Sequence, residues 1–509
     1  MNIRLFSKKT HGPLPPGPKP KSLIGNLADL PPPGVQEWIF WGKHRNLYGP
    51  ISSVTVFGKT LVIINDQHVA FDLLEKRSAI TSSRPRMVFG GDMVGLENAL
   101  TNLTYSDRFR AYRKSIHSLL GTKQAVSRFN ALQDIEVRRF LLRVLDEPER
   151  LIQHIRTESG AIILKISHGY TIEPSSRDPL IELADEALMH FSLATVPGAW
   201  LVDTLPFLKH VPNWVPGAGF KRTAARWRKT VMDFVEKPYA FVKQQVADGV
   251  AVPSYTSQLL EKGILSAEDE MVVKWSAASL YAGGSDTTVS SIACFFLAMT
   301  VNPEVQRKAQ EEIDRVIDDD RLPGFDDRQN LPYVDAIVKE ILRWHPVGPM
   351  ALPHTTTEDT TYEGYCIPKG SMLLPNIWGF AHDPETYHDP MSFKPERFLG
   401  TDGRAPEMDP HQLAFGFGRR ICPGRELADA SLYLTIVQSL AVFNITKAVE
   451  NGKEVEPVVD FTPGILSHPV EFKTCVRPRN TKAEALIRSI EEEHPFQPSD
   501  ASFLTRTEV

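Results

Sequence analysis

The sequence predicts a mainly α-helical protein with a minor β-sheet region. Apolar residues recur at helical spacing over three long stretches, 127–156, 227–248 and 267–299. Two β-rich runs, 51–58 and 60–64, stand near the N-terminus with a Gly-Lys turn between them. Because the helical stretches fill the middle of the chain, we expect helices to form the body of the protein and the sheet to be small.

Composition narrows the class of protein. With 509 residues, 42% of them hydrophobic, the chain can form one large unit or two to three domains. A net charge of -5 without a long basic run gives no support to nucleic-acid binding, so we expect no nucleic-acid partner. The four cysteines, none in C-x-x-C spacing, argue against a zinc site or a disulfide framework and predict a reducing compartment.

The N-terminal region divides into two segments. Residues 1–12 are basic and fall far short of the ~20 apolar residues that a membrane-spanning helix requires, so as written the sequence predicts no transmembrane segment there. Residues 13–20 are rich in proline and predict a stiff, extended hinge. By composition alone this hinge could also be a linker or an SH3 ligand.

Further along the chain, 107–117 predicts a basic helix, and 334–344 predicts an apolar one. Between them, residues 196–220 combine Pro and Gly with large apolar side chains. That composition predicts a mobile loop or short helices, and a core-packed connection is an equal alternative.

Cys422 lies in a glycine-rich turn, Phe415-Gly416-Phe417-Gly418-Arg419-Arg420-Ile421-Cys422-Pro423-Gly424, that leads into an apolar helix. Backbone N–H groups at a helix start and nearby arginines favour a thiolate, which is what a haem iron requires. Glycines let the backbone pass close to a flat ring. The alternative is a reduced cysteine in a surface loop.

A second motif, Ala282-Gly283-Gly284-Ser285-Asp286-Thr287-Thr288, places adjacent glycines inside a predicted helix over 276–290. Each glycine costs about 1 kcal/mol there relative to alanine. The motif is either a tolerated kink, with Thr287 bonding back to the preceding turn, or a place where a bound group needs space beside a hydroxyl and a carboxylate.

A third pattern is a pair of charges on one helix face. Glu340 and Arg343 stand three residues apart, so they can form an ion pair. Such pairs are usually solvated. Downstream, the run Phe393-Lys394-Pro395-Glu396-Arg397-Phe398 supplies a further arginine.

With these motifs in this order, the chain resembles the cytochrome P-450 superfamily over residues 13–480, with 481–509 a polar C-terminal tail. The resemblance implies the cytochrome P-450 fold and a single haem-binding monooxygenase domain. Cys422 would be the axial ligand of haem b iron. The composition of residues 196–220 resembles that of the same region in fungal microsomal members of specialised metabolism, such as oxidases of polyketide precursors.

The resemblance also implies roles for other residues. Thr287 would hold an ordered water beside bound dioxygen, and Asp286 would connect the site to bulk protons. Arg397 would join Glu340 and Arg343 in a structural network that holds the haem-binding loop. The remaining expected haem contacts are Arg113, His117, His354, Arg420, Phe415, Gly424 and Gly283.

One position departs from the family pattern W-x-x-x-R, because Phe109 stands in place of tryptophan. Phenylalanine has no indole N–H, so it cannot donate to a haem propionate. Arg113, four residues later, keeps the arginine of the pattern.

Expected substrate contacts, again by resemblance, are small or apolar: Ala278, Ala282, Val347, Met350 and Leu466. They favour a lipophilic small molecule such as a terpenoid, polyketide or indole. The reaction implied is insertion of one atom of dioxygen by hydroxylation, epoxidation or successive oxidation, in fungal secondary-metabolite biosynthesis.

The sequence contains no recognisable flavin domain, so the resemblance implies electrons from a separate NADPH-cytochrome reductase-type flavoprotein, with cytochrome b5 as an optional second donor. Arg110, Lys114, Arg419 and Arg425 would offer positive charge for docking it, although each could equally be a solvated surface residue. Family resemblance places such proteins on the cytosolic face of the endoplasmic reticulum.

Two other functions stay open from the sequence. The first is a haem-thiolate isomerase, dehydratase or peroxygenase. Such an enzyme depends less on a proton path through Asp286 and Thr287, so the presence of this pair favours a monooxygenase. A non-enzymatic haem-binding protein would not need the motifs intact.

Overall fold

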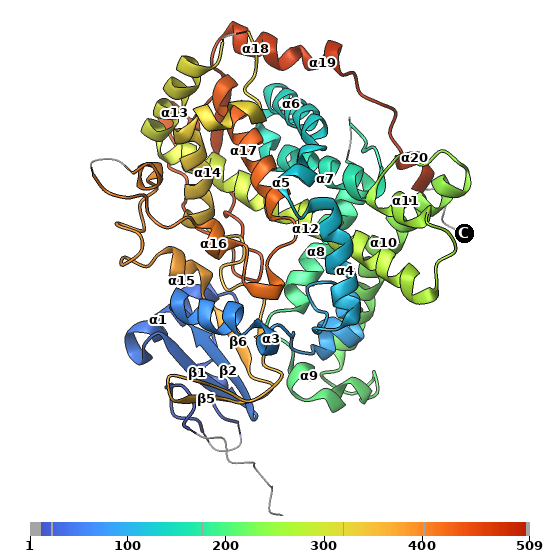
Figure 1. Ribbon diagram of the computed structural model, residues 1–509, viewed down its shortest axis with the longest axis vertical. Helices are drawn as coiled ribbons and strands as arrows, with labels where there is room; N and C mark the ends of the chain where they lie inside the picture. Colours follow the sequence, from blue (N-terminus) through green and yellow to red (C-terminus); the bar gives the residue numbers. More distant parts are fainter. Residues whose placement is uncertain (1–11, 22–23, 175–176, 319, 401–402, 505–509) are drawn as a thin grey trace, which may run out of the picture.

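A computed structural model of the chain describes residues 12–21, 24–174, 177–318, 320–400 and 403–504 (Figure 1). Apart from Gly12, the basic segment expected at 1–12 lies outside these described residues. Helices form most of the molecule and a small sheet lies at one end, next to α1, as the sequence predicts (Figure 1).

The α-helices are α1 (Glu37–Tyr48), α2 (Gln67–Ala70), α3 (Ser78–Thr81), α4 (Asp107–Leu120), α5 (Lys123–Ser127), α6 (Asn130–Asp146), α7 (Leu151–His168), α8 (Pro179–Ala194), α9 (Leu201–Thr204), α10 (Gly219–Ala247), α11 (Tyr255–Leu260), α12 (Ala267–Val301), α13 (Pro303–Val316), α14 (Pro332–Trp344), α15 (Ile377–Ala381), α16 (His411–Ala414), α17 (Arg425–Val442), α18 (Thr481–Arg488), α19 (Ile490–Glu493) and α20 (Ala501–Leu504). Short 3-10 or π turns are η1 (Leu27–Asp29), η2 (Phe71–Lys76), η3 (Val88–Met93), η4 (Leu96–Asn98), η5 (Pro148–Arg150), η6 (Pro206–His210), η7 (Phe325–Asn330), η8 (Pro395–Phe398) and η9 (Gly418–Arg420).

The strands are β1 (Ile51–Val56), β2 (Lys59–Ile64), β3 (His354–Thr355), β4 (Thr360–Tyr362), β5 (Tyr365–Ile367), β6 (Met372–Pro375), β7 (Phe443–Lys447), β8 (Val449–Glu450), β9 (Lys453–Glu454) and β10 (Thr474–Pro478). The largest sheet has the order β1-β2-β6-β3. Its β1 and β2 form an antiparallel hairpin with Ile51 opposite Ile64, while β2 and β6 run parallel.

The hairpin turn differs by one residue from the Gly-Lys turn expected. Phe57 and Gly58 both have positive φ, 46° and 79°, and Lys59 already belongs to β2. Two consecutive residues with positive φ make the type of tight turn that matches the twist of the paired strands.

The helical stretch expected over 127–156 is divided between α6 and α7. Pro148, in η5, interrupts it, because proline cannot donate the backbone hydrogen bond that would continue α6. The other two stretches form single helices, α10 and α12. In 196–220 the structure has α9 and η6, which are short helices.

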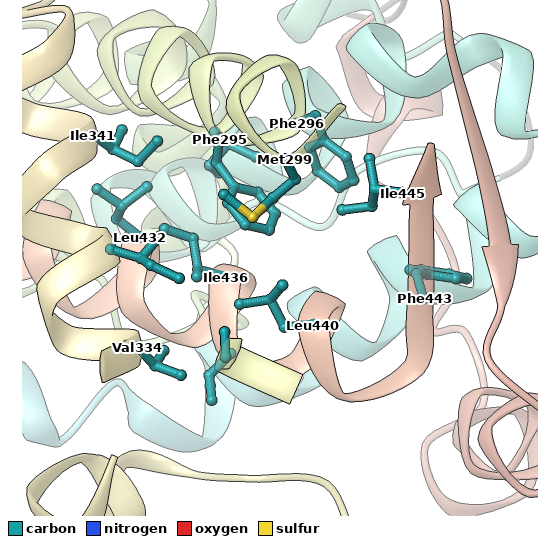
Figure 2. Packing of buried hydrophobic residues seen from close by; sticks show 14 of the residues in the cluster. Phe295, Phe296, Met299, Val334, Ile341, Leu432, Ile436, Leu440, Phe443 and Ile445 are labelled. Carbon is teal, nitrogen blue, oxygen red and sulfur yellow. The ribbon is translucent and has the colours of Figure 1, made fainter. Parts of the chain in front are cut away.

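The main hydrophobic core gathers around the C-terminal half of α12. Figure 2 shows Phe295, Phe296 and Met299 of α12 facing side chains of α14, α17 and β7. This core fixes α12, which carries Asp286-Thr287, against α17, the helix that begins just after Cys422.

Helix α12 is long and apolar enough to cross a membrane by length and composition alone. However, 72% of its apolar 18-residue stretch is buried inside the protein. Together with its place in the core, this burial makes α12 the central helix of the fold.

Part of the polar tail expected at 481–509 packs against the rest of the protein. Ala483, Ile487 and Ile490 are buried in the main core, at the spacing of one helix face. Asp500 exchanges hydrogen bonds with Thr171, its N–H donating at 3.0 Å and its carboxylate accepting at 2.8 Å. The segment 481–490 therefore packs against the body of the protein through its apolar face, and Asp500 ties the chain back to Thr171, while residues 491–498 between them are exposed.

Candidate active site

An internal cavity of about 410 Å³ separates the middle of α12 from the loop before α17 that carries Cys422. Its lining includes Gly283, Gly284 and Thr287 from α12 and Cys422 from the loop. Both principal sequence motifs thus face the same space from opposite sides.

The cysteine loop is held by its own backbone. The N–H of Cys422 donates to the carbonyl of Phe415 at 2.8 Å. Gly418, at φ 55°, lies against η2, where an added Cβ would stand 2.4 Å from the carbonyl oxygen of Leu74. Only glycine fits that position, since both the backbone angle and the close approach exclude a side chain.

The charge state of Cys422 depends on opposing effects. Burial raises the pKa of its thiol, whereas the N–H of Gly424 and the charges of Arg113 and Arg425 lower it. A metal cation bound to the sulfur would deprotonate it outright. The residues around Cys422 therefore suit a thiolate ligand once a metal is present.

Three arginines, Arg84, Arg113 and Arg420, line the cavity, and their hydrogen bonds go to backbone carbonyls. Among the described residues none of the three pairs with a carboxylate. Burial, and next the charge of Arg113, lowers the pKa of Arg420 to about 9. Burial, and next Arg420, lowers the pKa of Arg84 well below its usual range. Such a cluster of enclosed cations calls for an anionic ligand.

His354 lines the same cavity. Its Nδ1 lies 2.9 Å from the carbonyl of Thr81, which leaves Nε2 for a ligand. Burial, and next the charge of Arg84, holds the pKa of His354 well below its ordinary value. His354 is therefore neutral beside the arginines, and an anion bound among them would favour its protonated form.

Phe109, which stands where the family pattern has tryptophan, contacts Arg420. The guanidinium carbon of Arg420 lies 3.8 Å from the centroid of the Phe109 ring. The aromatic face therefore supports the arginine through a cation–π contact in place of an N–H donor.

The two glycines of α12 have different structural roles. An added Cβ at Gly284 would lie 2.5 Å from Ile163 of α7, so this glycine permits close helix packing. An added Cβ at Gly283 would meet nothing within 4 Å, because Gly283 faces the cavity. Helix α12 continues through both residues, and the Thr287 hydroxyl donates to the Gly283 carbonyl at 2.7 Å.

Asp286 is absent from the cavity lining and contacts His468, with 3.1 Å between its Oδ2 and the histidine Nε2. Neither Arg84 nor this role of His468 was predicted from the sequence. Ser83-Arg84-Pro85 has no distinctive pattern, and His468 lies in a loop without a recognisable motif.

The charge network lies beside the loop that leads to the cysteine. Arg343 donates from Nε and from a terminal nitrogen to Glu340, at 2.7 and 2.8 Å, and Arg397 approaches the same carboxylate at 3.2 Å. The side chains of Glu340 and Arg343 are fully buried. Arg343 also donates to the carbonyls of Pro390 and Ser392, so the network ties α14 to the segment before η8.

The structure brings most of the predicted site residues to the cavity. Those that line it are Cys422, Thr287, Arg113, His354, Arg420, Phe415, Gly424, Gly283, Ala278, Ala282, Val347 and Leu466. Three others do not line it: Asp286, described above, and two residues whose expected contacts are corrected, His117 and Met350. His117 is exposed near the end of α4, since one helical turn beyond Arg113 carries it past the cavity. Met350 packs with Trp41 and Val54 beside the small sheet.

These observations test the fit of haem. The cavity combines one enclosed thiol, a helix face without side chains at Gly283, and cations without carboxylate partners among the described residues. A flat, dianionic iron porphyrin would satisfy all three features, with Cys422 on the metal and Arg84, Arg113 and Arg420 beside its carboxylates.

Comparison with known proteins agrees with this geometry. The family model described as Cytochrome P450 matches residues 15–476. The chain is 52% identical to cytochrome P450 monooxygenase claR of Ampulloclitocybe clavipes, covering 96% of this chain and 91% of the relative. It is 48% identical to cytochrome P450 monooxygenase ppsD of Aspergillus oryzae, over 97% and 94%, and 44% identical to the O-methylsterigmatocystin oxidoreductase of Aspergillus flavus, over 99% and 94%. The protein that carries this cavity belongs to the cytochrome P450 family.

Proposed function

We propose that this cytochrome P450 monooxygenase inserts one atom of dioxygen into a lipophilic secondary metabolite. The observation that carries the proposal is the cavity between Cys422 and Thr287, whose remaining wall is mainly apolar. Leu188 and Phe191 of α8, Phe234 of α10 and Ile465 face it. A relative is named as an oxidoreductase of O-methylsterigmatocystin, which supports a compact metabolite as substrate.

The enzyme uses a cysteine-ligated haem, which supplies the reductive activation of dioxygen when bound. We assign Cys422 to the iron and Arg84, Arg113 and Arg420 to the haem carboxylates. Thr287 would hold water or substrate oxygen at its Oγ1, because that hydroxyl lies at the cavity wall. Asp286 would exchange protons with that water from the far side of α12.

Apolar residues position the substrate and exclude bulk water. Ser279 is among the polar residues of the wall, and its hydroxyl already donates to the Trp275 carbonyl at 2.7 Å and accepts from the Leu100 N–H at 3.2 Å. A substrate would therefore gain more from burying apolar surface against Ala278, Ala282 and Val347 than from hydrogen bonds to such groups.

An NADPH-dependent reductase-type flavoprotein is the proposed electron donor, with docking on the basic groups around the cysteine loop. Arg110, Lys114, Arg419 and Arg425 are exposed there. Arg110 pairs with Asp107 and Arg425 with Glu426, so part of their charge is compensated locally. Charge reversal Lys114→Glu should slow reduction by the flavoprotein several-fold at low salt, and the difference should shrink as salt rises. Lys369→Glu, on the exposed β5–β6 connection, is the matched control, and an equal effect there would contradict this docking face.

We place the protein at the cytosolic face of the endoplasmic reticulum. Its α9–α10 region exposes large apolar side chains, with Phe207 63% and Trp214 82% exposed. These residues suit contact with a membrane surface.

The experiment that tests the function follows isotopic oxygen. Purified holoenzyme, a reductase and NADPH are incubated with labelled dioxygen and a panel of terpenoids, polyketides and indoles. One labelled atom per oxidation is expected in the product. Thr287→Ala should lower the product formed per NADPH and raise hydrogen peroxide release, with Thr357→Ala on the surface as control. Unlabelled, isomerised product without NADPH use would contradict the proposal.

A further inference from the structure

The carboxylate of Asp286 is joined to a residue far along the chain. Its Oδ2 lies 3.1 Å from Nε2 of His468, in the segment 462–468 between β9 and β10. Neither residue lines the cavity, although Thr287 on one side and Leu466 on the other do. The pair therefore stands directly behind the cavity wall.

The segment that carries His468 is held in place by several hydrogen bonds. Ser290 of α12 donates its hydroxyl to the Ser467 carbonyl at 2.6 Å, and the Ser467 N–H donates to the Val347 carbonyl at 2.9 Å. The backbone N–H of His468 donates to the Thr462 hydroxyl at 3.0 Å. These bonds fix the imidazole against α12, so its contact with Asp286 is positioned by the fold.

Other ionisable groups surround the pair. Asp185 of α8 interacts with Asp286 through space and forms an ion pair with Arg156 of α7 at 2.8 Å. His345 lies on the other side, with its Nε2 2.8 Å from the Ser467 hydroxyl. That hydroxyl donates to the Thr462 carbonyl, so it accepts from Nε2 of His345, which is therefore committed to Ser467 and not to Asp286. His468 is the imidazole in contact with Asp286.

The side chains differ in access to solvent. His468 is 24% exposed and Asp286 15% exposed. The Nδ1 of His468 makes no hydrogen bond to any residue in the described part of the chain, which leaves it available to water. One ring nitrogen thus meets the carboxylate while the other can meet solvent.

From this geometry we propose that His468 is a positioning residue that relays protons from solvent to Asp286. A proton taken from water at Nδ1 is matched by one released from Nε2 to Oδ2 of Asp286. The ring returns to its starting tautomer when Nδ1 releases its proton to water and Nε2 takes up a proton by solvent exchange. No electrons move in this cycle. The proposal rests on the role of Asp286 given above as proton carrier to the cavity.

The first test is a proton-transfer measurement on the holoenzyme with NADPH and reductase. His468→Gln keeps a donor near Asp286 but cannot accept and release a proton. It should raise the ratio of hydrogen peroxide to water formed from dioxygen, on the order of tenfold. It should also enlarge the solvent deuterium isotope effect on that ratio. A purely structural role would leave the isotope effect unchanged. His68→Gln, an exposed histidine on α2, is the control.

A second readout does not depend on turnover. The unfolding midpoints of wild type, Asp286→Asn, His468→Gln and the double variant form a double-mutant cycle. The double variant should be no less stable than the less stable single variant. Strict additivity of the two shifts would overturn the contact itself.

The outcomes separate this proposal from the function it rests on. Uncoupling by Asp286→Asn together with normal coupling in His468→Gln would overturn the relay alone. Normal coupling in both variants would overturn the assigned role of Asp286. Carbon monoxide difference spectra should be the same for all variants, which keeps loss of haem from imitating either result.

Discussion

Three arginines line one cavity and donate their hydrogen bonds to backbone carbonyls: Arg84, Arg113 and Arg420. At this scale the sequence predicted two of the three, because Arg113 and Arg420 stand within recognisable patterns. Arg84 is placed by the contact of the segment after α3 with Leu352 and Pro353, 268 and 269 residues away. A contact of that kind leaves no local signal.

His411 gives a pH dependence at the residue scale. Burial alone would lower its pKa, but hydrogen bonds to Asp409 and Asp429, at 2.6 and 3.0 Å, outweigh that effect and raise the pKa to about 9 from an ordinary 6.5. The stabilisation is therefore fully present below pH 6.5 and is lost as the pH rises through about 9.

Between pH 6.5 and about 9, the free energy of unfolding of the wild type should fall. We predict that this fall exceeds that of His411→Gln by on the order of 2 kcal/mol. Urea unfolding of both proteins across the range measures this difference. Parallel pH curves for the two proteins would contradict the assigned ion pairs.

At the element scale, α12 combines two demands at adjacent residues. Gly284 allows α7 to approach, and Gly283 leaves the cavity open. The sequence alone could not divide these roles, because both glycines satisfy the same motif. It predicted the helix correctly, since the apolar spacing is sustained on both sides of the motif.

The two glycines form a matched pair for mutation. Gly284→Ala should destabilise the protein by about 1–3 kcal/mol, because its Cβ would overlap Ile163. Gly283→Ala should leave stability unchanged or raise it by up to about 1 kcal/mol, since alanine favours a helix and meets open space. Chemical unfolding measures the free energy of unfolding of both variants. Equal destabilisation would contradict the separate roles of the two glycines.

The Glu340-Arg343-Arg397 network links α14 to the segment before η8. Arg343→Lys keeps the charge but loses the two-pronged contact with Glu340 and several carbonyl contacts, so we expect a loss of about 3 kcal/mol in unfolding free energy. Arg307→Ala, which removes two exposed ion pairs on α13, with Glu304 and Glu311, should cost no more than about 1 kcal/mol. Unfolding in urea compares the two, and similar losses would show that the buried network is not structural.

Element boundaries were predictable where a local signal exists. Pro148 ends the α6 stretch, yet the apolar periodicity on both sides suggested one continuous run. The packing of Ala483, Ile487 and Ile490 was not predictable from the sequence, because charged residues surround them and the partner surfaces on α6 and α17 are formed only by the fold.

At the scale of the whole molecule, the site is assembled from segments that are far apart in the chain. Helix α12, the cysteine loop, the Arg84 segment and the loop 462–468 meet around one cavity, and the main core holds α12 and α17 together (Figure 2). The sequence predicted the fold class and, from motifs and family resemblance, part of the cavity wall. The contact of His468 with Asp286, across 182 residues, depends on packing that no local pattern records.

The measurement that tests the account most directly is the difference spectrum of the dithionite-reduced, carbon monoxide-bound protein, recorded for wild type and Cys422→Ala. A strongly red-shifted Soret band in wild type alone is the predicted result, because it reports a thiolate on haem iron. The same band in Cys422→Ala, or no haem in well-folded wild type, would contradict the claim that Cys422 holds haem in this cavity.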